Sequence, residues 1–108
     1  MKLQVGVKVL IKNKDSAYLF IQRAQKMGDE SEPHWDIPGG RINEDEPLHD
    51  ALAREIMEET GLQLSDEPHL INAQDIFVQK ADLHVVRLTY TAVGSGDAVM
   101  SNEHLHTQ

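Results

Sequence analysis

Alternation of apolar and polar residues marks the first part of the chain and predicts β-strands. Residues 3–11, LQVGVKVLI, are rich in β-branched side chains, which is typical of a strand. The turn residues KNKDS follow, and residues 17–24, AYLFIQRA, predict a strand that returns beside the first as a hairpin. Residues 25–33 are polar and have no period, so we predict a loop there. The segment HWDI then predicts a short strand that the turn PGG closes.

A helical period replaces the alternation over residues 43–60. Asn43 and Glu46 have the spacing of a capping box, which predicts that the helix begins at Asn43. Pro47 is tolerated in a first helical turn, and Gly61 is a typical residue at which a helix ends.

Two further strands, residues 69–79 and 83–93, follow the helix and are separated by KAD. Strands, one helix and more strands in this order predict an α+β fold with a mixed or antiparallel sheet. One helix covers only one face of such a sheet. Because no second helical pattern follows, we expect the other face to be bare or to be covered by a partner chain.

Composition narrows the class of protein. The 108 residues suit a single domain over residues 1–108, and the 40% of hydrophobic residues allow a core. Cysteine is absent, so disulfides and thiolate metal sites are excluded. The formal charge of −8 argues against a nucleic-acid surface built on phosphate contacts. The chain shows neither a signal peptide nor a run long enough to span a membrane, so we expect a cytoplasmic protein and no membrane partner.

Three glutamates gather on one face of the predicted helix. At about 100° per residue, Glu59 lies about 40° to one side of Glu55, and Glu58 lies about 60° to the other. Like charges at these spacings destabilise a helix by about 0.2–0.5 kcal/mol per pair. One explanation of these glutamates is a solvated acidic face, which would contribute to solubility and to nothing else. Carboxylate oxygens converging from one helix also suit a hard cation such as Mg²⁺ or Mn²⁺, which would offset the repulsion.

The same residues resemble the Nudix box. Gly40 is followed after five residues by Glu46, and after seven more by Arg54-Glu55-Ile56-Met57-Glu58-Glu59-Thr60-Gly61-Leu62, so residues 40–62 fill every fixed position. The flanking segments WDIPGG and YLFIQRA also resemble the strands of this family. The chain is therefore similar to MutT-like Nudix hydrolases from residue 3 to about residue 106.

This resemblance implies a mixed β-sheet that carries a loop-helix-loop motif. It implies a Mg²⁺- or Mn²⁺-dependent hydrolase that cleaves the diphosphate of a nucleoside diphosphate linked to another group. The metal ligands that it implies are Gly39, through its carbonyl, Glu55, Glu58, Glu59 and, as a ligand or base from a late loop, Glu103. Glu46 and Arg54 would pair and hold the catalytic glutamates in position.

Weaker signals concern substrate binding. Arg23 and Arg41 are candidates for phosphate contacts, because a guanidinium suits phosphate oxygens, although ordinary exposed cations are the alternative. Trp35 either lines a base pocket or is the main aromatic residue of the core. His104 and His106 have no third ligand nearby in the sequence, so they give only a weak indication of zinc.

Nudix domains usually continue into a helix that covers the second face of the sheet. No such C-terminal helix is predicted here, so we expect a homodimer through the uncovered face. A non-catalytic nucleotide-binding or regulatory module that retains the box is the alternative function, and a purely structural acidic domain is a third. The sequence does not identify the nucleotide substrate, since damaged nucleoside triphosphates, ADP-ribose, dinucleoside polyphosphates and nucleotide sugars all contain a diphosphate.

Overall fold

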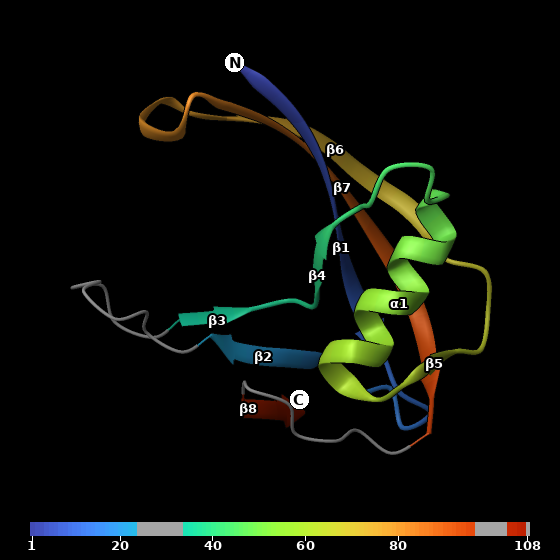
Figure 1. Ribbon diagram of the computed structural model, residues 1–108. Coiled ribbons are helices and arrows are strands. Elements are labelled where there is room, and N and C mark those ends of the chain that lie inside the picture. Colours follow the sequence, from blue (N-terminus) through green and yellow to red (C-terminus); the bar gives the residue numbers. More distant parts are fainter. Residues whose placement is uncertain (24–33, 97–103, 108) are drawn as a thin grey trace.

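The computed structural model describes residues 1–23, 34–96 and 104–107, which form two β-sheets and one α-helix (Figure 1). The strands are β1 (Lys2–Lys12), β2 (Leu19–Arg23), β3 (His34–Asp36), β4 (Gly39–Arg41), β5 (Gln63–Leu64), β6 (His69–Val78), β7 (Leu83–Ser95) and β8 (His104–Thr107). The helix α1 spans Leu48–Thr60, and a short 3₁₀ turn, Gln79–Ala81, joins β6 to β7. None of the helices in these segments is long and apolar enough to cross a membrane.

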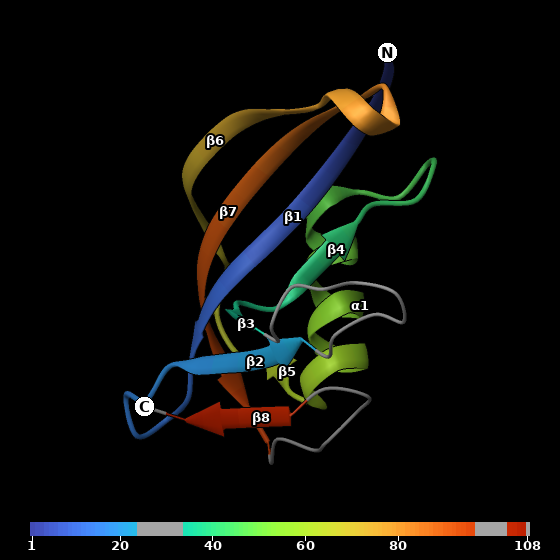
Figure 2. The same cartoon turned by 90° about the vertical axis from the view of Figure 1, so that its left-hand side faces the viewer.

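The main sheet is mixed and is centred on β1 and β7. These two strands run parallel, with Lys2 paired to Leu83 and Lys12 paired to Val93. β4 pairs antiparallel with the other edge of β1, whereas β5 and β6 pair antiparallel with β7. Figure 2 shows β6, β7 and β1 side by side as a curved layer, with β2 and β8 across one end. The predicted α+β class with a mixed sheet is therefore confirmed.

The predicted hairpin between the first two strands is wrong beyond its turn. Lys12 and Tyr18 form only an isolated bridge, after which β2 leaves the main sheet and pairs with β3 and β8 in a second, antiparallel sheet. The Asn13 side chain accepts hydrogen bonds from the backbone N–H groups of Asp15 and Ala17, which closes the turn locally. Alternation marks a strand but does not identify the strand with which it pairs. The strands β4, β5 and β8 were not predicted, because segments as short as these show no clear alternation.

The helix begins at Leu48, five residues after the predicted start. The Asn43 N–H does donate to the Glu46 carboxylate at 2.9 Å, but this contact lies in a turn before the helix. Asp45 has a φ of 61°, in the left-handed region, so the chain is not helical there. Gly61 ends the helix with a φ of 76°, and its N–H donates to the Met57 carbonyl, as predicted.

Burial alternates along β1 and defines two faces of the main sheet. Val7, Val9 and Ile11 are fully buried in one cluster with Leu52 and Ile56 of α1. The intervening residues of β1 must therefore point to the face opposite α1. The larger apolar side chains exposed on the long strands are Leu3, Leu70, Ile71, Phe77 and Val78.

Candidate active site

Two glycines place the start of the Nudix box between β1 and α1. A Cβ atom on Gly39 would overlap the carbonyl oxygen of Val7, and its φ of 150° also favours glycine. A Cβ atom on Gly40 would lie 2.7 Å from the Glu55 carboxylate. The backbone of β4 therefore lies directly against β1 on one side and against a helix glutamate on the other.

Arg54 is the centre of the polar network at this site. Its Nε donates to Glu46 Oε2 at 2.8 Å, and its Nη2 donates to Glu46 Oε1 at 2.9 Å, so the pair is bidentate. Nη2 also donates to the Arg41 carbonyl at 3.1 Å. On the other side, Nη1 lies 2.8 Å from Glu55 Oε1 and 3.4 Å from Glu58 Oε2. One guanidinium thus connects the loop, β4 and two glutamates of α1.

The pairing fixes the charge of both partners. The hydrogen bond from Arg54, followed by the backbone N–H of Asn43, lowers the pKa of Glu46 to about 2. The same hydrogen bond to Glu46 raises the pKa of Arg54 above its ordinary value. Both groups therefore stay ionised at neutral pH. This constancy suits residues that hold the site in place, rather than residues that exchange protons.

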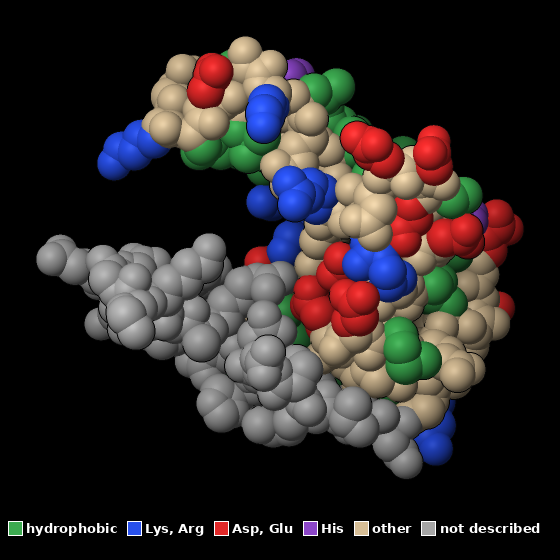
Figure 3. All heavy atoms as spheres, in the orientation of Figure 1, with side chains coloured by type: hydrophobic (Ala, Val, Ile, Leu, Met, Phe, Trp, Pro, Cys, Tyr) green, Lys and Arg blue, Asp and Glu red, His purple; other side chains and the backbone are tan. Residues whose placement is uncertain are grey.

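The three helix glutamates differ in environment. The Glu55 side chain is 12% exposed and lies against Gly40, whereas that of Glu58 is 58% exposed. Glu59 is partly buried. Figure 3 shows the acidic side chains gathered over α1 and the loop before it, with Lys and Arg side chains beside them.

The residue types at this site suit a divalent cation, but their side chains are not arranged around one common point. Carboxylate and backbone carbonyl oxygens are the ligands that Mg²⁺ and Mn²⁺ prefer, and Gly40 leaves room for the Glu55 carboxylate beside the backbone. Within residues 1–23, 34–96 and 104–107, however, no three His, Cys, Asp or Glu side chains are arranged to hold a metal ion. Arg54, which contacts Glu55 and Glu58, offsets part of their repulsion itself.

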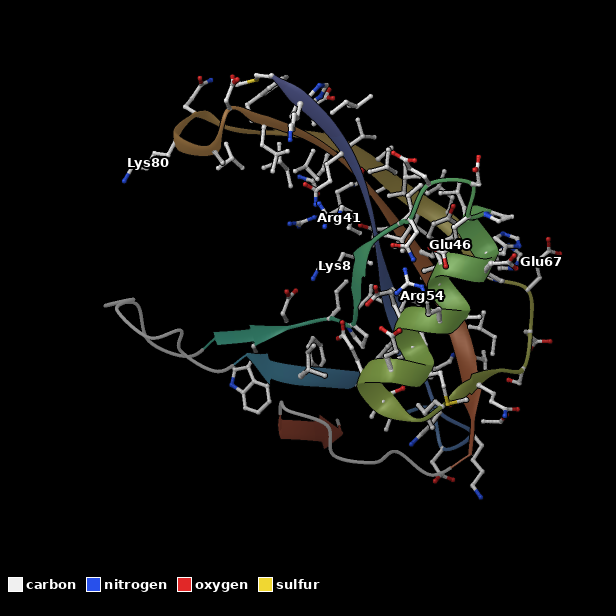
Figure 4. All side chains as sticks on the ribbon, viewed as in Figure 1. Lys8, Arg41, Glu46, Arg54, Glu67 and Lys80 are labelled. Atoms are coloured by element: carbon white, nitrogen blue, oxygen red, sulfur yellow. The ribbon has the colours of Figure 1, made fainter. Side chains whose placement is uncertain are left out.

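The structure places the remaining predicted residues in different parts of the molecule. Figure 4 shows the Arg41 and Lys8 side chains extending from the strands on the side away from α1, and Arg41 is exposed. Trp35 lies on β3 and is 50% exposed, so of its two predicted roles the one as main aromatic residue of the core is wrong, whereas the one in a base pocket stays a prediction. The Arg23 backbone pairs with His34 of β3. Glu103 lies outside the described residues, as does the predicted loop at residues 25–33.

Lys8 is a residue that the motif did not reveal. Its Nζ donates to Asp36 Oδ2 at 2.8 Å and to the Ile37 carbonyl at 3.4 Å. It therefore ties the segment just before the diglycine to the main sheet. In the sequence Lys8 is one of several polar residues of an alternating strand, and its partner is 28 residues away, so the pattern gives no signal for this pair.

A hollow of about 650 Å³ opens between the start of β1 and the loop before α1. Its lining includes Arg41 and Glu46, and also the apolar side chains of Leu3, Val5 and Ile42. None of the three helix glutamates lines it. The hollow therefore adjoins the Arg54 network and is distinct from the glutamate face.

Comparison with known proteins places this geometry in a family. The family model described as "NUDIX domain" matches residues 2–106. The chain belongs to the NUDIX domain family. The MutT NUDIX hydrolase of Burkholderia pseudomallei is similar in structure, with 28% identity and a TM-score of 0.81 over 99% of this chain and 83% of that chain. The MutT protein of Methanosarcina mazei Go1 has 25% identity and a TM-score of 0.75 over 98% of this chain and 75% of that one.

A curated relative matches this NUDIX domain over a shorter region. The m7GpppN-mRNA hydrolase NUDT17 of Danio rerio is 42% identical over 66 residues, which is 60% of this chain. The match covers 21% of that protein, so this chain spans only a small part of its length. The resemblance to Nudix proteins and the predicted fold are thus confirmed.

Proposed function

We propose that this NUDIX domain is a nucleotide pyrophosphohydrolase that cleaves the diphosphate of a nucleoside diphosphate linked to another group. The carrying observation is the position of Arg54, which is bidentate to Glu46 and also contacts the Glu55 carboxylate. Family membership and the similarity to MutT hydrolases support the same activity. The m7GpppN-mRNA hydrolase of Danio rerio supports a nucleotide substrate without specifying the nucleotide.

In this proposal Glu55, Glu58 and Glu59 hold Mg²⁺ or Mn²⁺ together with the carbonyl of Gly39. The bound cation supplies charge neutralisation of the diphosphate and a more nucleophilic water. Glu103 stays a prediction as a further ligand or base. Arg54 keeps Glu55 oriented through its fixed pairing with Glu46, and Gly40 keeps the space beside Glu55 open.

Substrate contacts follow from the cations near the network. Arg41 is exposed beside Gly40 and lines the 650 Å³ hollow, so it is placed to contact a phosphate of the bound nucleotide. Arg23 and Trp35 complete the proposed substrate-binding residues; Trp35 is half-exposed on β3, and an indole ring is of a kind that stacks on a base.

The decisive experiment is a hydrolysis assay on a panel of nucleotides with and without Mg²⁺. Wild-type protein, Glu58→Gln and Glu59→Gln are compared, with Glu67→Gln as the matched control, because Glu67 is an exposed glutamate in the loop between β5 and β6 (Figure 4). We expect metal-dependent release of phosphate-bearing product that both box variants abolish and that the control retains. Full rates in Glu58→Gln and Glu59→Gln would reject the proposal.

Two other outcomes identify the alternative functions. Nucleotide binding without turnover would indicate a non-catalytic binding or regulatory module. A thermal midpoint that Mg²⁺ does not move would indicate a purely structural acidic domain, since a ligand that binds the folded state raises its stability. The homodimer through the face opposite α1 stays a prediction, and light scattering at high protein concentration tests it.

A further inference from the structure

The face of the main sheet opposite α1 is the basic face of an acidic protein. Alternation and register place on it five of the ten Lys and Arg residues of the chain, namely Lys2, Lys8, Lys12, Arg41 and Arg87. None of the 18 acidic residues occupies a position of β1, β4, β6 or β7 on this face. In a chain with a formal charge of −8, this separation of charge indicates an anionic ligand.

Acidic side chains from outside these strands lie near the basic residues of this face at three places. Asp36 pairs with Lys8, so the charge of Lys8 is already compensated. Asp66 and Glu67 adjoin Lys12 around a second hollow at the end nearest the turn after β1.

At the other end of β1, Arg41 shares the first hollow with Glu44, Asp45 and Glu46 of the loop before α1, and Glu46 is already paired with Arg54. Arg87 lines neither of the two hollows and has no acidic neighbour of this kind among the described residues.

Arg41 and Arg87 stand on either side of Gly6. Gly6 of β1 is in register with Arg41 of β4 and with Arg87 of β7, and Arg87 is in register with Gln74 of β6. Paired residues of adjacent strands point to the same face, so the two arginine side chains leave the sheet on one face, on either side of a position that has no side chain. Neither side chain has an ion pair or a hydrogen bond to any part of the chain that the structure describes.

The missing side chain of Gly6 creates the space for a ligand. A Cβ atom there would lie 3.7 Å from the Gly40 carbonyl oxygen and 4.0 Å from Cγ1 of Val85, which are ordinary contact distances, so glycine leaves the surface lower between the two arginines than any other residue would. Two strand spacings, about 10 Å, separate the backbones of β4 and β7. Arginine side chains are long enough to converge on one group bound over Gly6. A guanidinium binds phosphate oxygens in a bidentate manner, so phosphate is the chemistry that two such arginines fit.

The geometry points to a second anion subsite, formed by Arg41 and Arg87 across Gly6, that takes a phosphate group of the substrate beyond the diphosphate that is cleaved. This inference rests on the proposed function, because it assumes that the diphosphate of the substrate is cleaved at the helix glutamates. Gly40 lies between the helix glutamates and the proposed subsite, because Glu55 lies against one side of its backbone and Gly6 lies beside its carbonyl. The subsite favours substrates that have an additional phosphate over ADP-ribose or nucleotide sugars.

The additional phosphate belongs either to a longer phosphate chain or to the sugar of the nucleotide. Inorganic tripolyphosphate represents the first source, and a nucleoside 3′,5′-bisphosphate represents the second. Calorimetric titration in EDTA measures their binding to wild-type protein, Arg87→Gln and Arg87→Lys. Lys80→Gln is the matched control, because Lys80 is an exposed cation at the tip between β6 and β7 (Figure 4).

We expect wild-type protein to bind at least one compound, and the one that binds more tightly identifies the source of the phosphate. Arg87→Gln should weaken that binding roughly tenfold, Arg87→Lys should weaken it less, and Lys80→Gln should leave it unchanged. Equal affinities of wild-type protein and folded Arg87→Gln, or no binding of either compound to wild-type protein, would overturn the inference. Since no metal or turnover is needed, binding that depends on Arg87 sustains the subsite even if the nucleotide panel shows no hydrolysis.

Discussion

The Lys8 ammonium lies 2.8 Å from the Asp36 carboxylate and joins the main sheet to the second sheet. The side chains are 14% and 28% exposed, so water screens the pair only in part. Lys8 also donates to the Ile37 carbonyl, two residues before Gly39. The position of the diglycine segment therefore depends on this pair as well as on β4.

Replacement of Lys8 by Met should lower the free energy of unfolding by about 1–2 kcal/mol, because the Asp36 carboxylate then loses the hydrogen bond from the Lys8 ammonium. Urea denaturation of Lys8→Met, Asp36→Asn and the double variant measures the coupling between the two residues. We expect the double variant to be less destabilised than the sum of the single variants. Additive effects would contradict a direct interaction.

The Glu46–Arg54 pair should make part of the stability depend on pH. The pKa of Glu46 is lowered from 4.5 to about 2, so the folded protein holds the ionised form more strongly than the unfolded chain does. This contribution is complete above pH 4.5 and is lost as the pH falls toward 2. Urea denaturation between pH 6 and pH 2 should therefore show a weaker pH dependence for Glu46→Gln than for wild-type protein.

Glu44→Gln is the control for that experiment, since Glu44 is exposed in the same loop. Its stability should fall with pH in parallel with that of the wild-type protein. A Glu46→Gln variant with an unchanged pH dependence would show that the hydrogen bond from Arg54 does not lower the pKa of Glu46.

Gly40→Ala should impair the site more than it impairs the fold. The new Cβ would lie 2.7 Å from the Glu55 carboxylate, so this flexible side chain must move out of place. We expect kcat/KM for the hydrolysed nucleotide to fall about a hundredfold, because small displacements of catalytic groups have effects of this size. Steady-state kinetics and thermal unfolding measure the two effects separately, and a large loss of stability with unchanged activity would contradict the prediction.

Gly94→Ala is the complementary variant. A Cβ atom there would lie 2.6 Å from Ile11 Cδ1, inside the core and away from the glutamates. Overpacking of this kind should destabilise the protein by about 1–3 kcal/mol and leave kcat/KM of the folded protein unchanged. Reduced activity without reduced stability would show that Gly94 influences the site.

Thr60 should stabilise the end of α1 through its hydroxyl. It is fully buried, its Oγ1 donates to the Ile56 carbonyl at 2.6 Å, and it accepts from the Leu62 N–H at 3.1 Å. Thr60→Val has nearly the same shape but leaves the buried N–H without an acceptor, so we expect a loss of about 1–3 kcal/mol. Chemical denaturation with Thr60→Ser as the control tests this, because serine keeps the hydroxyl. A Thr60→Ser variant that is less stable than Thr60→Val would show that the methyl group matters more.

The sequence alone determined the local features of this protein. Residues 40–62 identified the family, because the spacing of the box is a property of consecutive residues. The helical period over residues 43–60 predicted the helix, although it begins only at Leu48. Gly61 predicted its end, because a residue without a side chain adopts the left-handed conformation at little cost. Alternation along residues 3–11 predicted the strand β1, since successive side chains of a strand point to opposite faces.

The tertiary structure decided what depends on partners far apart in the chain. The strand at Leu19–Arg23 joined a second sheet instead of a hairpin, and the polar segment His104–Thr107 became its partner, because pairing depends on packing and not on local pattern. Lys8 forms an ion pair with Asp36, which is distant in sequence. Arg41 and Arg87 lie on either side of Gly6 because of the register of three strands. Electrostatic sites depend on such distances in space, and a one-dimensional pattern does not contain them.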